Sequence, residues 1–206
     1  VCSFRSQSGF LSVLDWLTEK ERAVISRRIG LWNNEPETLQ SIGDDFEITR
    51  ERVRQIEDVW IRKIGRIIKS SELQEIQRVG ESFLKLHGGL MTRDKLVSAV
   101  ISGMQLHTDT NMGIIEVVLQ SDFNIQRSKP QLGTRSYFVL PEINKKTIPE
   151  IHKEALRLLK KRGDIMENIV LHEAIRWTLL PIFGKLDTMF IDSVLDVYLD
   201  IVKGEE

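Results

Sequence analysis

One helical segment of this chain combines side chains that could read the bases of a nucleic acid. On a helix that advances about 100° per residue from Arg50, the residues Val53, Trp60 and Ile64 fall in one apolar stripe. The opposite side carries long hydrogen-bonding side chains. In a major groove, Arg can bind guanine through two hydrogen bonds, Glu can accept one from the cytosine amine, and Gln can pair with adenine. The pattern predicts a base-reading face that includes Glu51, Arg54 and Gln55.

The residues before this segment predict the elements that would position it. Thr49 is a suitable N-cap for a long helix from Arg50 toward Lys69, and Thr38 is one for a short helix that precedes it. A turn at 47–48 joins the two helices into a helix-turn-helix, which places the first turns of its second helix against base edges. A solvated helix with local ion pairs is the alternative explanation of so much charge. The helix-turn-helix context favours DNA.

Charge is distributed unevenly along the chain. Lys and Arg number 29 against 30 Asp and Glu, so the net charge of −1 does not by itself indicate a nucleic-acid partner. Residues 50–69, however, hold seven basic and three acidic side chains, whereas residues 181–206 hold two basic and six acidic ones. The basic part coincides with the predicted reading helix. We therefore expect contacts to the DNA backbone from its polar and basic residues Thr49, Arg52, Arg62, Lys63 and Lys69.

The segment from about Leu11 to Lys69 resembles region four of the primary bacterial sigma factors. The motif Thr38-Leu-Gln-Ser-Ile-Gly43 is followed, at the spacing of that family, by Ile48-Thr-Arg-Glu-Arg-Val-Arg-Gln-Ile-Glu57. The resemblance implies that this segment contacts the minus-thirty-five promoter element and the flap of RNA polymerase. It implies base contacts from Arg50, Glu51 and Gln55, backbone contacts from Thr38 and Leu39, and a further contact from Arg54.

Two departures from the family pattern make contacts with polymerase and activators less strongly expected than contact with DNA. Gln40-Ser41 replaces the usual acidic pair, and Val59-Trp60 followed by Gly65 interrupts the basic surface that the family presents to activators. Nothing in the chain resembles region two, whose aromatic residues melt the promoter. These residues alone are therefore not expected to initiate transcription.

The middle of the chain predicts a winged helix. Helical patterns at Leu73–Leu86, from Thr92, and at Met112–Phe123 precede two short alternating segments, Phe123-x-Ile125 and Tyr137–Leu140, that read as a β-hairpin. The arrangement weakly resembles the winged helix of the polymerase delta subunit, which is also found fused to restriction enzymes. The basic residues of the hairpin either contact phosphates as a wing or keep an edge strand soluble; they are Arg127, Lys129 and Arg135.

The last part of the chain repeats the middle part. Residues 158–175 align with 83–100 at a constant offset of 75 positions, which predicts a second three-helix unit. Chance similarity of two amphipathic helix pairs is the alternative. Together the patterns predict a mainly α fold of tandem helix-turn-helix units, divided as 1–70, 71–145 and 146–206. The predicted last helix carries a row of carboxylates, which a phosphate backbone would repel: Asp192, Asp196 and Asp200.

Composition narrows the class of protein further. No apolar run approaches the roughly 20 residues of a membrane helix, so we expect a soluble cytoplasmic protein without a membrane partner. Cys2 is the single cysteine, and the four histidines show neither metal-ligand spacing nor a partnered nucleophile. No phosphate loop or hydrolase motif occurs. We expect no metal, no cofactor and no enzymatic activity.

Three hypotheses follow from these patterns. The first is sequence-specific binding of double-stranded DNA in a transcription-related role, with RNA polymerase as a further possible partner. The second is a DNA-targeting segment of a larger restriction or defence protein whose catalytic part lies elsewhere; since the chain does not begin with Met, a fragment is conceivable. The third is an interaction module that binds polymerase or a sigma factor without reading DNA. The sequence does not determine the oligomeric state or the target site.

Overall fold

The structure is a computed structural model that describes residues 6–33, 35–106, 110–129, 131–163 and 165–204, with side chains from residue 10 onward. The chain forms two compact units. The first comprises Val1–Gly80 and Val97–Ile125, and the second comprises Glu81–Leu96 and Gln126–Glu206. Each unit is considered separately below.

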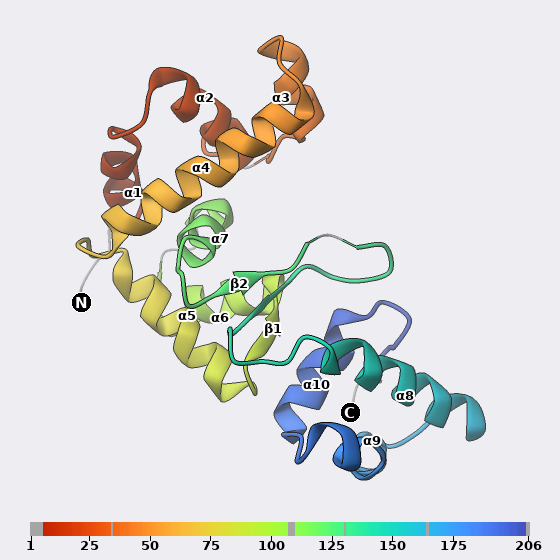
Figure 1. Ribbon diagram of the computed structural model, residues 1–206. Coiled ribbons are helices and arrows are strands. Elements are labelled where there is room, and N and C mark those ends of the chain that lie inside the picture. Colours follow the sequence, from red (N-terminus) through yellow and green to blue (C-terminus); the bar gives the residue numbers. More distant parts are fainter. Residues whose placement is uncertain (1–5, 34, 107–109, 130, 164, 205–206) are drawn as a thin grey trace. The chain divides into compact units, whose positions relative to one another are not determined.

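Four helices build the N-terminal part of the first unit (Figure 1): α1 (Ser6–Leu14), α2 (Glu19–Arg28), α3 (Leu39–Asp45) and α4 (Arg50–Ile68). Three threonines begin the last three of these helices, and two of them, Thr38 and Thr49, are the caps that the sequence analysis predicted. Thr18 forms a capping box with Glu21, while Thr38 and Thr49 each accept a hydrogen bond from the backbone N–H three residues later, at 3.1 Å. Each cap satisfies a donor that the helix itself leaves unpaired.

The turn between α3 and α4 is tight. Ile48 donates its backbone N–H to the Gly43 carbonyl at 2.9 Å, and a Cβ added to Gly43 would lie 2.7 Å from the Ile48 carbonyl oxygen. Glu47 takes a positive φ of 53° to close the turn. The two helices then bury Ile42 and Val53 together with Val24 of α2. This small core fixes the predicted helix-turn-helix.

A winged-helix order of elements follows α4: α5 (Gln74–Leu86), β1 (Leu90–Thr92), α6 (Arg93–Gly103), α7 (Met112–Gln120), β2 (Gln126–Arg127) and β3 (Tyr137–Val139). The strands form an antiparallel sheet in the order β1-β3-β2, with Leu90 and Gln126 both opposite Val139. The predicted strand at 123–125 is wrong by a few positions. Ile125 is buried at the end of a turn and pairing starts after it, so its burial imitated a strand pattern. Strand β1 was not predicted.

Helix α7 is buried within the first unit. Six consecutive side chains, from Ile114 to Leu119, are buried. Asn111 caps the helix and donates its Nδ2 to the Gly30 carbonyl at 2.8 Å. At the other end of α7, Gln77 of α5 donates its Nε2 to the Val118 carbonyl at 3.0 Å. Helix α7 thus lies against the N-terminal helices as well as against α5.

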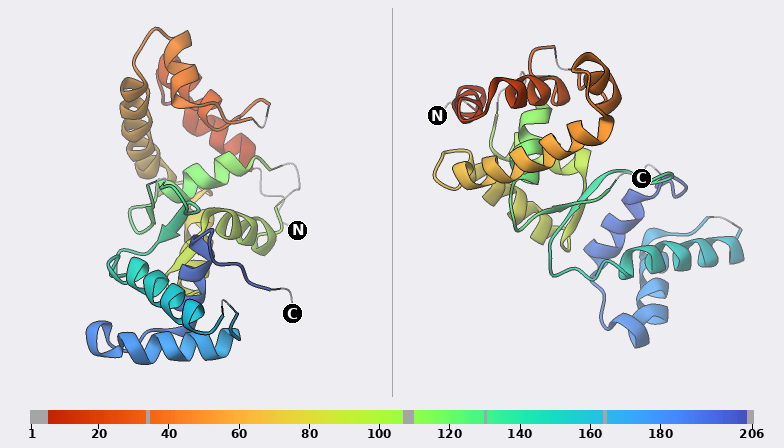
Figure 2. Two further views of the ribbon diagram at one scale, coloured as in Figure 1. Left: turned by 90° about the vertical axis from the view of Figure 1, so that its right-hand side faces the viewer. Right: turned by 45° about the horizontal axis from the view of Figure 1, so that its top comes forward.

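The second unit ends in three more helices, α8 (Thr147–Lys161), α9 (Asn168–Phe183) and α10 (Thr188–Val197), which lie together in both views of Figure 2. Helices α6 and α9 begin 75 positions apart, and α7 and α10 begin 76 apart, in agreement with the predicted repeat. Residues 165–167, the counterpart of β1, form no strand. Instead α10 packs on β1 itself, because a Cβ on Gly88 would lie 2.5 Å from the Phe190 backbone nitrogen.

The predicted mainly α architecture with a small hairpin sheet is confirmed. The three-part division of the chain stays a prediction. Among the described residues, no helix has both the length and the apolar character needed to cross a bilayer.

Candidate nucleic-acid interface

Helix α4 has one buried and one exposed face. Val53, Trp60 and Ile64 are at most 1% exposed, whereas the four predicted base-reading residues in the first two turns are exposed. The apolar stripe anchors the helix on α2 and α3, so the opposite side points away from the small core of the helix-turn-helix. The exposed side is the one that carries Arg50, Glu51, Arg54 and Gln55.

An ion-pair network covers part of this exposed face. Arg54 donates to both carboxylate oxygens of Glu51, at 2.9 and 2.6 Å, and to Asp58 at 2.6 Å. The hydrogen bonds from Arg54 hold the pKa of Glu51 below its usual range, and Glu51 in turn raises the pKa of Arg54. Both groups therefore stay charged at neutral pH. Since the pairs are exposed, DNA can replace them at small energetic cost.

The other two candidate base-reading residues, Gln55 and Arg50, differ in how many internal hydrogen bonds their side chains form. Gln55 accepts a hydrogen bond from Arg52 Nη1 through its Oε1 at 3.2 Å, and a hydrogen bond from its side chain also helps to lower the pKa of Glu51. Arg50 forms no hydrogen bond or ion pair with the residues that the structure describes. Arg50 therefore needs no internal bond broken before it reaches a base, whereas Arg54 does.

The predicted backbone-contacting cations of α4 fall into two groups. Arg62 is exposed and donates its Nε only to the Asp58 carbonyl of the preceding turn, at 3.1 Å. Lys63, on another side of the helix, forms an ion pair with Glu21 of α2 at 2.7 Å. Lys69 lies over the Phe123 ring, 4.9 Å from its centroid. Arg62 is thus available to a phosphate, while Lys63 and Lys69 already have partners inside the first unit.

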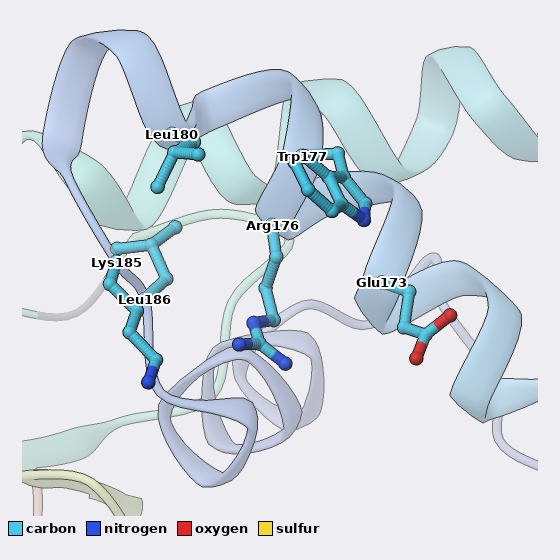
Figure 3. Close-up of a pocket in the computed structure, with 6 residues that line it drawn as sticks. All are labelled: Glu173, Arg176, Trp177, Leu180, Lys185 and Leu186. Atoms are coloured by element: carbon cyan, nitrogen blue, oxygen red, sulfur yellow. The ribbon is translucent and has the colours of Figure 1, made fainter.

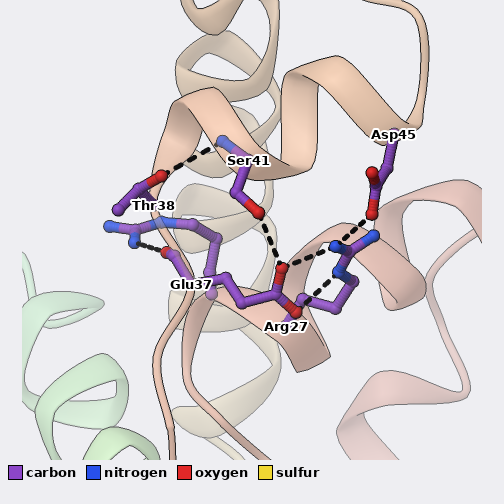
Figure 4. A network of polar contacts seen from close by, with 6 residues as sticks. Arg27, Glu37, Thr38, Ser41 and Asp45 are labelled. Carbon is purple, nitrogen blue, oxygen red and sulfur yellow. Dashed lines mark hydrogen bonds and ion pairs between the residues drawn. The ribbon is translucent and has the colours of Figure 1, made fainter.

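Ion pairs of Arg27 with Glu37 and Asp45 hold α3 against α2 (Figure 4). Arg27 binds the Glu37 carboxylate through Nε, at 2.7 Å, and through Nη2, which also reaches Asp45 at the other end of α3. Ser41 donates its hydroxyl to the same Glu37 carboxylate at 3.2 Å. Arg27 holds the pKa of Glu37 below its usual range. These ion pairs fix the start of α3. There the predicted backbone contact Thr38 is exposed, and Leu39 is half-buried against the core.

Sequence reasoning missed Arg27 and Glu37. Arg27 lies on α2 and Glu37 lies ten residues later, before α3 begins, and no helical period or motif relates them. The only signal was their opposite charge, which many surface pairs share.

The three predicted wing residues lie in the second unit. Arg127 belongs to β2 and is half-buried, and Lys129 is exposed in the following loop. Arg135 donates its Nη1 to the Asp196 carbonyl at 2.6 Å, and its backbone N–H to the Val197 carbonyl at 2.7 Å. The residues after α10 therefore run antiparallel beside 133–135, with a bridge between Thr134 and Tyr198. That side of the wing is paired within the chain.

The carboxylate row of α10 is neutralised inside the second unit. Lys203 bonds Asp192 and Asp196, each at 2.8 Å, and Lys95 also bonds Asp196. Burial raises the pKa of Asp196, but the hydrogen bonds from Lys203 and Lys95 outweigh burial and leave that pKa below its usual range. Asp200, just beyond the helix, bonds His152 at 2.9 Å. No group of three or more metal-ligating side chains occurs in the described part of the chain.

Comparisons with known proteins agree with this geometry. Residues 13–64 match the family "Sigma-70, region 4". Two proteins named RNA polymerase sigma factor RpoD, from Helicobacter pylori strains ATCC 700392 / 26695 and J99 / ATCC 700824, are each 49% identical to this chain over 65 residues. The aligned part is 29% of this chain and spans a tenth of each relative's length, 10%. The predicted resemblance of the N-terminal segment to sigma region four is confirmed.

Proposed function

We propose that this chain binds double-stranded DNA sequence-specifically through α4, in a transcription-related role. The observation that carries the proposal is the pairing, on one helix, of a buried stripe around Trp60 with an exposed first two turns that offer Arg, Glu and Gln. These turns follow a capped helix-turn-helix, and the N-terminal end of a second helix in that motif reaches base edges. The similarity to sigma factors supports a promoter element as the target.

The chemistry of the face gives each candidate residue a role. Arg50 is free to bind guanine through its O6 and N7 atoms, and the Gln55 amide can pair with adenine. Glu51 can accept from a cytosine amine once Arg54 turns from it toward a phosphate or a base. Thr38, Leu39, Thr49, Arg52 and Arg62 would contact the backbone, which sets register without reading sequence. Lys63 and Lys69 would add attraction after releasing their present partners.

Selection of bound duplexes from a random pool tests binding and base preference together. We expect a short consensus of about 4 to 6 base pairs, which is the reach of one helix in a major groove. Fluorescence anisotropy on the selected duplex should then show affinity that falls steeply with salt, since phosphate contacts release counterions. Binding without any base preference would contradict sequence-specific reading, and no binding at low salt would reject the proposal.

A second candidate function is binding of RNA polymerase, which the similarity to sigma factors also supports. The specific observation is two large exposed indoles in the connections on either side of α2, Trp16 and Trp32, at 75% and 74% exposure. Exposed aromatic side chains of this size are enriched in protein interfaces. Co-sedimentation with core polymerase should be lost in Trp16→Ala/Trp32→Ala and kept in Arg50→Ala. If the indole variant still co-sediments, the indoles are not the polymerase contact.

This proposal includes no catalytic step. A catalytic sequence elsewhere in the full-length gene would favour a DNA-targeting segment of a restriction or defence protein. A promoter-like selected sequence would favour transcription, and a sequence unrelated to promoters would favour the targeting alternative.

A further inference from the structure

Helix α9 has the composition of a buried helix but exposes one side. Its inner face buries Leu171, Ile175 and Leu179 in the core of the second unit. The outer side exposes large apolar side chains, of which Ile169 and Trp177 are 73% and 74% exposed and Leu180 is 42% exposed. Several large apolar side chains exposed together on one side of a helix are typical of a protein interface.

The exposed side has the spacing of a helix-packing seam. Ile169, Glu173, Arg176 and Leu180 follow one another at intervals of 4, 3 and 4 residues, the spacing that keeps side chains on one line of a packed helix. Figure 3 shows Glu173, Arg176 and Leu180 in succession along α9. Together with Lys185 and Leu186 they line a pocket of about 330 Å³. Trp177 flanks the line. We call Ile169, Glu173, Arg176 and Leu180 the α9 seam.

We propose that the α9 seam binds the α9 seam of a second copy of this chain, antiparallel, around a two-fold axis. In a two-fold contact, residue i meets residue j and j meets i. The seam is self-complementary under that operation. Ile169 and Leu180 lie equally far from the midpoint between residues 174 and 175, and so do Glu173 and Arg176. Each apolar end then faces an apolar end, and each charge faces its opposite.

The charges also select the orientation. A parallel pairing would place Glu173 opposite Glu173 and Arg176 opposite Arg176, and like charges that face each other across helices are unfavourable. The antiparallel pairing forms two Glu173–Arg176 ion pairs, one on each side of the axis. Both groups are available for this, because neither has an ion-pair partner among the residues that the structure describes. An acidic or basic helix of another protein would satisfy only one of the two charges.

The interface would be small. One helix from each copy buries less than the about 1,600 Å² of a standard interface, so we expect a reversible dimer with a dissociation constant of about 1 to 100 μM. Such a dimer would carry two copies of helix α4, and two linked sites raise the apparent affinity for a duplex with two targets. The inference concerns the second unit alone and does not depend on the proposed DNA binding.

Sedimentation velocity of the full chain tests the dimer and its charge pattern. At about 100 μM half or more of the unmodified chain should sediment as a dimer. Glu173→Arg gives two facing positive pairs and Arg176→Glu two facing negative pairs, and each should weaken dimerisation about tenfold or more. The double variant Glu173→Arg/Arg176→Glu should restore the dimer, because the swapped charges again face opposite charges.

Mixing the two single variants provides a second test that also reports their folding. The mixture should form a heterodimer, in which a positive seam faces a negative one. As matched controls, Glu150→Arg reverses a partly exposed charge on α8, and Met112→Ala removes an exposed apolar side chain of α7; both should leave dimerisation unchanged. Trp177→Ala should weaken it.

Three results would overturn the inference. The first is a chain that stays monomeric at this concentration. The second is a dimer that both single reversals leave intact. The third is failure of the double variant and of the mixture to recover a dimer while far-ultraviolet circular dichroism shows helix content equal to that of the unmodified chain.

Discussion

Helices α4 and α7 stand at the same place in two consecutive helix-turn-helix units, yet only α4 has a face that could enter a DNA groove. In α4 the charged and amide side chains of the first two turns are exposed, and the apolar stripe begins at Val53. In α7 the six residues from Ile114 to Leu119 are all buried. Helix α10, which lies at the corresponding place in the predicted repeat, is also largely buried. Position in the motif therefore does not by itself give a helix an exposed polar face that could contact DNA.

The two helices also depend on each other. Gly65, near the end of α4, lies against the backbone at the end of α7, where a Cβ would come within 2.2 Å of the Ser121 carbonyl oxygen. The last turns of α4 are thus used for packing on α7, while its first turns stay exposed. Helix α7 therefore supports α4 and offers no second exposed polar face of its own.

The largest effect should come from breaking this support. In an exposed helix, Gly→Ala stabilises by about 1 kcal/mol. At Gly65 the added methyl meets a carbonyl oxygen that cannot move alone, so we expect Gly65→Ala to lower the free energy of unfolding by about 3 kcal/mol. Thermal unfolding should then occur roughly 10 °C lower. The sign of the change is decisive, and a stabilised Gly65→Ala variant would contradict the packing of α4 on α7.

Gly80→Ala is the matched control for Gly65→Ala. A Cβ on Gly80 of α5 would also come within 2.2 Å of an atom, but that atom is Cδ2 of Leu119, at the end of a side chain that can rotate. We expect a loss smaller than that of Gly65→Ala by about 1 kcal/mol or more. Equal losses would mean that the contact with the Ser121 backbone has no special weight.

The second effect concerns the reading face of α4. Arg50→Ala and Gln55→Ala should each reduce discrimination at one base pair of the selected duplex by about 1 to 3 kcal/mol, because each removes one side-chain contact to a base edge. Competition binding with duplexes substituted one base pair at a time measures this. Met112→Ala, at an exposed position of α7, should leave every preference unchanged. A change of base preference in Met112→Ala would contradict the assignment of reading to α4 alone.

Much of this comparison could be predicted from the sequence, and the rest could not for identifiable reasons. The caps Thr18, Thr38 and Thr49 and the stripe of α4 depend on interactions within four residues, which a local pattern records. The sequence predicted a helix at Met112–Phe123, but neither its burial nor the element that covers it. Gly65 was interpreted only as an interruption of a basic surface, since its close approach to Ser121 joins residues 56 positions apart.

The small sheet and the candidate site show the same limit. Strand β2 has two residues and β1 three, too short for an alternating pattern, and the buried Ile125 shifted the predicted strand. The face of Arg50, Glu51, Arg54 and Gln55 was predicted and is exposed. Its internal bonds from Arg54 to Glu51 and Asp58 were not predicted, because one Arg among several acidic neighbours could pair in several ways. Whether these residues bind DNA stays a prediction.

A third, smaller effect separates phosphate contact from surface charge. Arg62→Ala should weaken binding to all duplexes alike and reduce the slope of log affinity against log salt by about 1, since one phosphate contact is lost. Arg78→Ala removes an exposed arginine of α5 that lies outside the predicted interface, and we expect its slope to equal that of the unmodified chain. An unchanged slope in Arg62→Ala would place Arg62 outside the DNA contact.

The smallest effect tests whether the middle of α4 is held by α2 or is free for DNA. The hydrogen bond from Lys63 lowers the pKa of Glu21 from its ordinary value of 4.5. A carboxyl whose pKa is lower in the folded state adds stability above the unfolded pKa and loses it as the pH falls through the folded pKa. Lys63→Ala should therefore lower the free energy of unfolding at pH 7 by about 0.5 kcal/mol or less, as for other exposed pairs. Below the folded pKa of Glu21 the difference should vanish.

A double-mutant cycle of Lys63→Ala with Glu21→Gln isolates this pair from the capping box that Glu21 also forms. Urea unfolding is measured at pH 7 and at a pH below the folded pKa of Glu21. Coupling at pH 7 that disappears in acid assigns Lys63 to the support of α4. If coupling is absent at pH 7 and Lys63→Ala instead reduces the salt slope of DNA binding, Lys63 belongs with Arg62 on the reading side. The part of α4 that contacts DNA would then extend about one turn further along the helix, to include Lys63.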